Sequence, residues 1–253
     1  MQIIKLTETA KTQKTSNSRL ITAIKPSIKT ENRVNVFVDD KFDFSLDIAQ
    51  VIDLHIKVGL ALTEDELKKC RHASEFGKLY FATLEYALSR PHSEKEVRDH
   101  LIKRRRNREI LNRQAVINRE KSKLEREKYK LRTRELPLYT DDDINEVISR
   151  LKLKGYIDDE KFVMFYLENR FVKKGISEKR MRQELAKKGI ENRLIDSAFK
   201  NHPRDQREEI SKIIKRKSRH YEPEKLIAYL VRQGFDYQQS KDAVREMGSQ
   251  NLE

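Results

Sequence analysis

A nine-residue pattern that recurs three times along the chain limits its fold more than any other feature. Residues 177–185 (SEKRMRQEL) align with residues 93–101 (SEKEVRDHL) and with residues 222–230 (EPEKLIAYL). The second and third copies begin 45 residues apart, whereas 84 residues separate the first two starts. A repeat of this length with helical patterning is typical of a tandem helical array. The spacing also predicts an insertion of roughly 35–40 residues in the first repeat.

The middle repeat, residues 155–199, is predicted to contain three short helices. Asp158 can cap the first, because its side chain accepts hydrogen bonds from free backbone N–H groups. Ser177 is the predicted cap of the second helix and Asn192 that of the third, and a glycine follows each of the first two helices. Helices this short cannot each bury a large face alone, so we expect neighbouring repeats to pack on one another. The predicted inward-facing residues include Phe162, Phe165, Tyr166, Met181, Leu185, Ile195 and Phe199.

Residues 19–72 carry a different pattern, which predicts a small antiparallel sheet of about three strands. Residues 34–38 (VNVFV) alternate with the period of a strand, and the aspartates at 39–40 form a plausible tight turn. A small sheet needs a cover for its apolar face. Helices predicted at 46–58 and 63–72 can supply that cover.

The first repeat departs from the other two because no glycine follows its second helix. Residues 103–106 (KRRR) continue without a helix breaker, so the helix is predicted to run to Arg134, ahead of Pro137. Residues 103–134 contain 14 lysines and arginines against 4 glutamates, a net charge of +10. Most of the positive charge of the chain can therefore lie in this insertion.

Ile110, Ile117, Leu124 and Leu131 recur every seven residues along the insertion. A coiled coil needs two apolar positions per heptad, so this stripe is half of a seam. One interpretation is a solvated helix that lies on its own repeats through this stripe. The other is a basic rod whose cations neutralise phosphates, in contacts that are independent of base sequence and weaken with salt. The sequence supports these two interpretations equally.

The composition favours an anionic partner and a thin core. Charged residues make up 38% and hydrophobic residues 37% of the 253 residues, which suits an elongated repeat protein. The net charge of +14 favours nucleic acid or an acidic protein surface, although solubility alone also explains it. The single cysteine, Cys70, excludes an internal disulfide and is compatible with a reducing cytosol. Because the sequence shows neither an apolar run of about 18 residues nor a secretory signal, we predict a cytoplasmic protein without a membrane span.

The sequence offers no catalytic or nucleotide-binding motif. It contains neither a P-loop nor a GxGxxG segment. Asp141–Asp143 stands at a predicted helix start, where carboxylates usually act as caps, and three adjacent helical residues diverge too much to face one metal ion. Cys70 and His72 lack further zinc ligands nearby. We therefore predict no enzymatic activity, no cofactor and no metal, with a metal-dependent nuclease using Asp141–Asp143 as the least favoured alternative.

Several short segments in the second and third repeats share an order and a spacing. They are Gly155–Phe162, Arg170, Lys174–Gly175, Arg180, Arg182–Leu185, Lys188–Ile190 and Arg232–Phe235. In this arrangement the chain resembles the RecX family, the bacterial modulators of RecA recombinase, over about residues 20–248 apart from the insertion. The resemblance implies three tandem three-helix repeats in an elongated, curved array. It also implies binding in the groove of a RecA–DNA filament, altered filament assembly and, usually, inhibition of the recombinase.

We therefore predict a mainly α protein with three tandem three-helix repeats in an elongated array, preceded by a small β-rich segment. A long basic helical insertion lies in repeat one. The predicted domains are a flexible tail (1–18), a small sheet with helices (19–72), repeat 1 (73–155) with the insertion at about 104–136, repeat 2 (156–201) and repeat 3 (202–253).

The predicted function is that of a non-catalytic, monomeric regulator. It would bind the RecA–DNA filament, inhibit recombinase and ATPase activity in recombination, DNA repair and the SOS response, and contact DNA through basic surfaces. The alternative is a stand-alone basic helical module that binds nucleic acid without a recombinase partner. The predicted partner- or DNA-binding residues are Arg104, Arg105, Arg106, Arg108, Arg113, Arg119, Lys123, Lys130, Arg170, Lys173, Lys174, Arg180, Arg182, Lys187 and Lys188.

Overall fold

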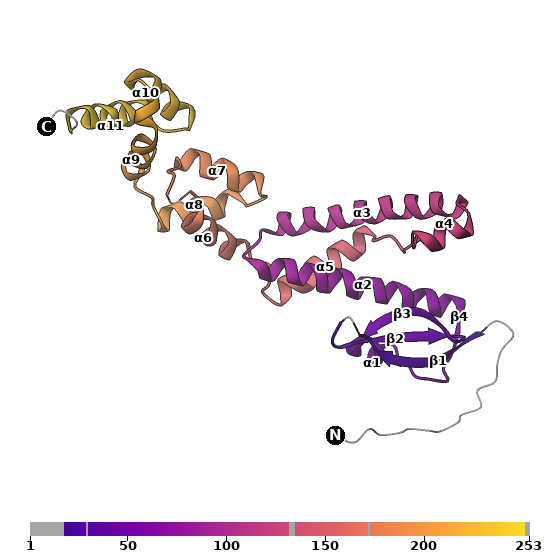
Figure 1. Cartoon of the computed structure of the whole chain (residues 1–253). Helices are drawn as coiled ribbons and strands as arrows, with labels where there is room; N and C mark the ends of the chain where they lie inside the picture. Colours follow the sequence, from indigo (N-terminus) through magenta and orange to yellow (C-terminus); the bar gives the residue numbers. More distant parts are fainter. Residues whose placement is uncertain (1–17, 29, 132–134, 172, 251–253) are drawn as a thin grey trace. The chain divides into compact units, whose positions relative to one another are not determined.

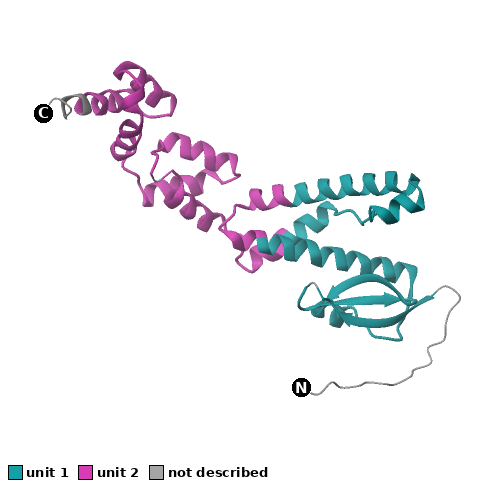
Figure 2. Ribbon diagram, viewed as in Figure 1, with its two compact units in different colours: residues 1–85, 101–147 teal, residues 86–100, 148–253 magenta. Residues whose placement is uncertain are grey.

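The computed structural model shows a mainly helical chain with a small antiparallel sheet near its N-terminus, which confirms the predicted fold class (Figure 1). The structure describes residues 18–250 except 29, 132–134 and 172. The tail predicted at 1–18 therefore lies outside the described residues, apart from Ser18. The chain divides into two compact units, which are treated separately below (Figure 2). Unit 1 contains residues 1–85 and 101–147, and unit 2 contains residues 86–100 and 148–253.

Unit 1 is built on a four-stranded sheet in the order β3-β2-β1-β4, one short strand more than predicted. All neighbouring strands are antiparallel. The predicted turn between the second and third strands is confirmed, since Asp39 and Asp40 have φ values of 47° and 63°, a geometry that aspartate tolerates in tight hairpins. The strands are β1 (Ser18–Pro26), β2 (Arg33–Val38), β3 (Lys41–Asp47) and β4 (Ala61–Thr63).

Two helices cover the apolar side of this sheet, α1 (Ile48–Asp53) and α2 (Glu64–Ser89). Asp47 and Gln50 form a capping box at the start of α1. Thr63 and Glu66 form another, because the Thr63 backbone N–H donates to Glu66 over 2.8 Å. The buried core between sheet and helices includes Ile21, Val36, Leu46, Leu67 and Cys70.

The helix predicted at 63–72 does not end before repeat 1, which was predicted to begin at residue 73, because α2 is one helix of 26 residues that crosses this boundary. Ser74 is buried, and its hydroxyl donates to the Ser45 carbonyl of β3 over 2.6 Å. A serine in mid-helix can bond a neighbouring element instead of starting a new helix. The polar residue that suggested a boundary therefore attaches α2 to the sheet.

The insertion begins inside a long helix, α3 (Glu94–Glu120), and continues with the short helix α4 (Lys123–Lys128). The prediction of one helix up to Arg134 was wrong in its extent. Ser122 caps α4, and the Glu125 side chain accepts from the Ser122 backbone N–H in return. This local capping box competes with continuation of α3 and ends it. The chain then enters α5 (Asp141–Leu153).

Unit 2 contains the second and third repeats, each with its own core. The three helices predicted within 155–199 are confirmed, with Asp158 and Ser177 as caps. The third starts one residue earlier than predicted, since Glu191 is the cap position and Asn192 the first helical residue. The helices are α6 (Asp159–Asn169), α7 (Glu178–Lys187), α8 (Asn192–Asn201), α9 (Gln206–Lys217), α10 (Pro223–Arg232) and α11 (Tyr237–Gln250). The two cores include Phe162, Met181, Leu185, Ile195 and Phe199 in repeat two, and Ile210, Ile213, Leu226, Leu230 and Phe235 in repeat three.

Candidate partner-binding surface

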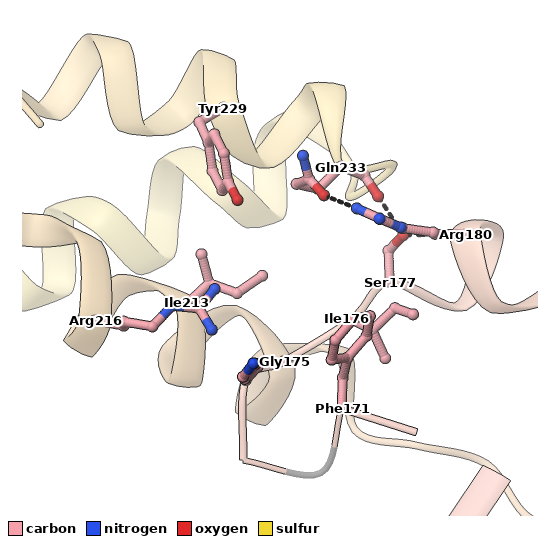
Figure 3. A pocket seen from close by; sticks show the side chains of 10 residues that line it. Phe171, Gly175, Ile176, Ser177, Arg180, Ile213, Arg216, Tyr229 and Gln233 are labelled. Atoms are coloured by element: carbon pink, nitrogen blue, oxygen red, sulfur yellow. Dashed lines mark hydrogen bonds between the residues drawn. The ribbon is translucent and has the colours of Figure 1, made fainter. Parts of the chain in front are cut away.

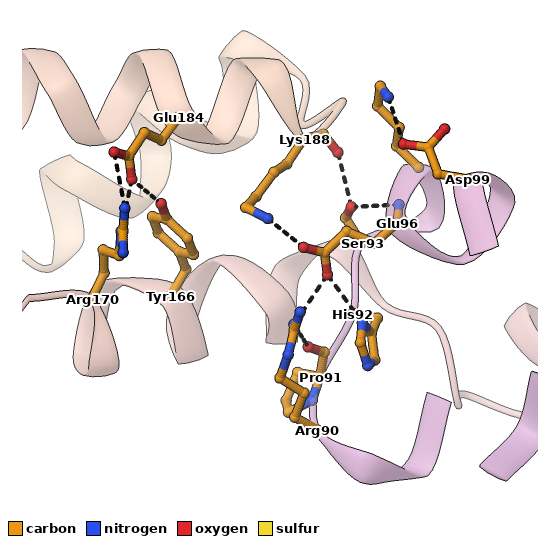
Figure 4. A network of polar contacts seen from close by, with 11 residues as sticks. Arg90, Pro91, His92, Ser93, Glu96, Asp99, Tyr166, Arg170, Glu184 and Lys188 are labelled. Atoms are coloured by element: carbon orange, nitrogen blue, oxygen red, sulfur yellow. Dashed lines mark hydrogen bonds and ion pairs between the residues drawn. The ribbon is translucent and has the colours of Figure 1, made fainter. Parts of the chain in front are cut away.

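Two serines at aligned positions of the repeats make the same contact across successive repeats. The Ser93 hydroxyl donates to the Lys188 carbonyl over 2.8 Å (Figure 4), and the Ser177 hydroxyl donates to the Gln233 carbonyl over 2.5 Å. Each serine caps the second helix of its repeat, and each carbonyl ends the second helix of the next repeat. One hydroxyl thus serves as hydrogen-bond partner for a backbone N–H at the start of one helix and for a carbonyl at the end of another. We call these contacts junction 1 (Ser93 with Lys188) and junction 2 (Ser177 with Gln233).

The equivalence of the junctions extends to the backbone around them. The Glu94 N–H donates to the Asp159 carboxylate over 2.9 Å, and the Glu178 N–H donates to the Gln206 side chain over 3.2 Å. Asp159 and Gln206 are the first residues of α6 and α9. The first N–H groups of a helix have no partner inside the helix, so an acceptor from the next repeat satisfies them. Junctions 1 and 2 are therefore one structural device used twice.

A glycine lies against each junction and allows its close approach. Gly189 has φ of 81° and Gly234 has φ of 94°. A Cβ atom on Gly189 would lie 2.8 Å from the Lys95 Cβ, and one on Gly234 would lie 2.8 Å from the Ser177 hydroxyl oxygen. Both the left-handed backbone and the short separation exclude a side chain at these positions.

The side chains around the two junctions differ. At junction 1, Glu96 pairs with Lys188, accepts from Arg90 over 3.0 Å and lies 3.0 Å from the buried His92 (Figure 4). Burial alone would raise the pKa of Glu96, but the hydrogen bonds from Arg90 and Lys188 outweigh it and lower the pKa to about 2. At the equivalent position of junction 2, Arg180 donates to the Gln233 side chain. The acid of junction 1 is thus replaced by a base at junction 2.

Glu184 neutralises part of the predicted basic surface of repeat two. Its carboxylate accepts from Arg170 over 2.7 Å and from the Tyr166 hydroxyl (Figure 4). It also accepts from Arg180 over 3.2 Å. Burial opposes its ionisation, but the bonds from Arg170 and Tyr166 dominate and hold the pKa of Glu184 at about 2. Arg170 and Arg180 therefore keep a carboxylate partner at neutral pH.

A cavity of about 210 Å³ opens beside junction 2 (Figure 3). Its walls come from the segment between α6 and α7 and from α7, α9 and α10. Lys174 and Arg216 are exposed at its rim, and neither has a carboxylate within ion-pair distance among the described residues. Tyr229 and Phe171 add aromatic faces. Two unneutralised cations beside aromatic rings suit a carboxylate or phosphate attached to an apolar or flat group. The lining residues are Phe171, Lys174, Gly175, Ile176, Ser177, Arg180, Ile213, Arg216, Tyr229 and Gln233.

Arg108, predicted as a partner contact, lies inside unit 1. It pairs with the buried Glu75, donates to the Pro137 carbonyl over 2.9 Å and lies 4.0 Å from the centre of the Tyr139 ring. Burial would raise the pKa of Glu75, but hydrogen bonds from Lys78 and Arg108 outweigh it and lower the pKa, so Glu75 is ionised. This guanidinium fastens α3 to α2 and to the segment before α5, so we leave Arg108 out of the proposed surface.

The other predicted basic residues divide by their partners. Several have carboxylate partners: Arg105 (Asp141, 2.6 Å), Arg119 (Glu135, 2.9 Å), Lys123 (Glu127, 3.9 Å), Arg182 (Glu178, 2.7 Å, and Asp196, 2.5 Å) and Lys188 (Glu96). Arg104 is half-buried. Within the described part of the chain, five are exposed and have no ion pair: Arg106, Arg113, Lys130, Lys173 and Lys187. These five, with Lys174, are the predicted cations that remain available to a partner.

Sequence reasoning missed Arg216 and Tyr229 as site residues. The repeat alignment carried a signal, because Tyr229 stands 45 residues after Glu184, at the equivalent position of the next repeat. An aromatic ring thus occupies the place of the neutralising carboxylate. The cations at junction 2 consequently have one carboxylate fewer to pair with.

Two of the three aspartates at the start of α5, Asp141 and Asp143, make structural contacts. Asp143 is buried, accepts from the Thr140 N–H over 2.8 Å and lies 3.1 Å from a His72 ring nitrogen. Asp141 pairs with Arg105. Among the described residues, no three acidic, histidine or cysteine side chains come together as metal ligands. In the same part of the chain, no helix is long and apolar enough to cross a membrane.

Comparisons with known proteins agree on one family. A model of the regulatory protein RecX N-terminal domain matches residues 19–63, and a model of the second three-helix domain of RecX matches residues 158–198. A regulatory protein RecX of Oceanobacillus iheyensis is 25% identical over 75% of this chain, which spans 60% of that protein. One of Bacillus licheniformis is 25% identical over 91% of this chain and 78% of its own length.

A solved structure has a similar fold. The crystal structure of a regulatory protein RecX superposes with a TM-score of 0.57 at 19% identity, over 90% of this chain and 99% of that one. At this identity the similarity concerns the fold alone. It agrees with a helical repeat architecture.

Proposed function

Because the chain belongs to the RecX family of regulatory proteins, we propose that it binds the RecA–DNA filament and inhibits its recombinase and ATPase activities. We further propose that it acts as a cytoplasmic monomer, by binding alone. A regulatory role agrees with the names of its relatives. In the acidic run Asp141–Asp143, the one site considered for a nuclease, Asp143 is engaged in capping and Asp141 in an ion pair, which favours a binding role.

The observation that carries this proposal is the cationic cavity at junction 2. Junctions 1 and 2 hold the helix ends of successive repeats in one arrangement, so the cations beside them keep fixed positions within unit 2. Lys174 and Arg216 then offer two charges at a set spacing to an acidic side chain or a phosphate of the filament. Binding one filament state more tightly than another would shift the filament toward that state and change its activity.

The first experiment measures RecA-catalysed ATP hydrolysis on single-stranded DNA as this protein is added. We expect inhibition at amounts well below RecA, and at least tenfold weaker inhibition by the double variant K174E/R216E, since both cavity charges are reversed. R193E/K200E is the matched control, because these exposed cations lie on α8, which contributes nothing to the cavity lining. An equal loss of inhibition in both double variants would show that net charge alone explains the effect. That result would contradict the cavity as the binding site.

The second candidate function is a stand-alone nucleic-acid-binding module, favoured by the exposed cations Arg106, Arg113 and Lys130 of the insertion. Phosphate contacts of this kind weaken steeply with salt. If the chain is such a module, ATP hydrolysis should fall only when this protein covers the DNA itself. The fall should then follow DNA occupancy measured in the absence of the recombinase. Inhibition at amounts that leave the DNA bare would exclude it.

A further inference from the structure

The apolar stripe predicted along the insertion faces away from the body of unit 1. Ile110 and Ile117 of α3 are 54% and 51% exposed, and Ile102, which lies eight residues before the predicted stripe, is 42% exposed. Leu124, which continues the stripe onto α4, is 76% exposed. The interpretation in which α3 lies on its own repeats through this stripe is therefore wrong. Exposed apolar residues that line up on one helix face are a candidate interaction surface.

Residues on the side of α3 opposite the stripe, apolar as well as polar, attach the helix to its own unit. The buried side of the helix contains Leu101, Arg108, Ala115 and Asn118. Arg108 pairs with Glu75, and the Asn112 side chain donates to the Leu136 carbonyl over 2.8 Å and accepts from the Leu136 N–H over 2.9 Å. These directional bonds fix the rotation of the helix about its axis. That rotation leaves the isoleucines uncovered.

Two arginines alternate with the isoleucines on the exposed side. At 100° per residue, Ile102, Arg106, Ile110, Arg113 and Ile117 fall within a stripe roughly 80° wide and about 22 Å long. Arg106 and Arg113 are exposed, and no described carboxylate lies within ion-pair distance of either. We call these five residues the Ile–Arg stripe. Its spacing covers two heptads, with an apolar and a cationic residue in each.

The charges indicate which partner fits the Ile–Arg stripe. In an antiparallel pair of two copies, Arg106 of one helix would oppose Arg113 of the other, so like charges disfavour self-association. A nucleic-acid backbone would pair with the arginines but would leave three isoleucines against phosphates. An amphipathic helix with apolar and acidic residues in alternate core positions would match both components.

From this geometry we propose that the Ile–Arg stripe is a docking surface for an acidic amphipathic helix of another protein. The isoleucines pack against its apolar residues, and Arg106 and Arg113 pair with its carboxylates. This inference stands independently of filament binding, because it uses a different face, in unit 1. By the same helical geometry, Lys103 borders one edge of the stripe and Glu109 the other.

The test uses the full chain and three fluorescent helical peptides of four heptads, with leucine at one core position. The other core position is glutamate in the acidic peptide, lysine in the basic peptide and serine in the neutral peptide. We expect the acidic peptide to bind at least tenfold more tightly than either of the others. R106E/R113E should weaken binding of the acidic peptide at least tenfold and strengthen binding of the basic peptide. Loss of folding cannot produce this reversal of preference.

Two further variants separate the components of the stripe. I110S/I117S should also weaken the acidic peptide about tenfold with unchanged thermal unfolding, since both side chains are exposed. K173E/K187E carries the same charge reversal on exposed lysines of unit 2 and should leave peptide binding unchanged. The proposal is overturned if the acidic peptide fails to bind, if acidic and basic peptides bind alike, or if the wild type dimerises through the stripe in sedimentation and I110S/I117S is monomeric.

Discussion

Junctions 1 and 2 share their backbone contacts and differ in their side chains. In both, a serine hydroxyl donates to the carbonyl that ends the second helix of the next repeat, and a glycine admits the close approach. Junction 1 is closed by Glu96, which gathers Arg90 and Lys188. Junction 2 has Arg180 at the equivalent position and a cationic cavity beside it. The shared contacts therefore build the array, whereas the residues that differ between the junctions decide what each junction can bind.

The largest expected effect comes from adding a methyl group at the shared glycines. Gly189→Ala and Gly234→Ala should each lower the free energy of unfolding by about 2–4 kcal/mol, because a strained left-handed alanine adds to a steric overlap. Urea unfolding monitored by circular dichroism measures this. Gly155→Ala is the matched control, since Gly155 has φ of 72° but nothing within 4 Å of the added Cβ. The free energy of unfolding of Gly155→Ala should fall by only about 1–2 kcal/mol. Equal losses at all three glycines would show that the junctions are not tightly packed.

A smaller effect is expected from the serines. Ser93→Ala and Ser177→Ala should each reduce the free energy of unfolding by about 1–3 kcal/mol, since each removes a helix cap and leaves a carbonyl without its donor. Similar losses for the two variants are expected because the contacts are equivalent. Ser122→Ala removes an exposed cap outside the junctions and should lose about 1 kcal/mol or less. A loss confined to one of the two junction serines would break the equivalence.

The smallest effect is expected in the dependence of the free energy of unfolding on acidic pH. The folded pKa of Glu96, about 2, lies below its usual value of 4.5, so its stabilising contribution is complete above pH 4.5 and is lost as the pH falls toward 2. Glu96→Gln should therefore flatten the pH dependence of unfolding in this window. Gln233→Ala, which alters the equivalent contact of junction 2, should leave that dependence unchanged. The account fails here if Glu96→Gln retains the full acid dependence of the wild type.

Local signals predicted the repeat helices well. Ser177, Asp158 and the glycines that follow the helices act through their nearest neighbours, so their roles are visible in the sequence. The same signals misled at Ser74, which bonds a strand far away in the chain, and missed the capping box at Ser122. A side chain that bonds a distant element gives no local sign of doing so.

The candidate sites depended on packing between distant segments and were predicted less well. The cavity at junction 2 joins residues from four elements, and Arg216 and Tyr229 have no distinctive local context. Ile110 and Ile117 of the Ile–Arg stripe were visible in the sequence as part of an apolar heptad repeat. Their exposure depends on the buried Arg108 and the half-buried Asn112, which lie on the inner side of α3. The apolar pattern alone therefore did not decide which face of α3 lies inward.

Filament binding by this chain is tested most directly by comparing two affinities at the same salt concentration. The fluorescently labelled full chain is titrated with RecA–single-stranded DNA filaments and, separately, with the same DNA alone. We predict at least tenfold tighter binding to the filament, and that K174E/R216E loses this preference while R193E/K200E keeps it. Equal affinity for filament and bare DNA would contradict the proposed function and leave a nucleic-acid-binding module in its place.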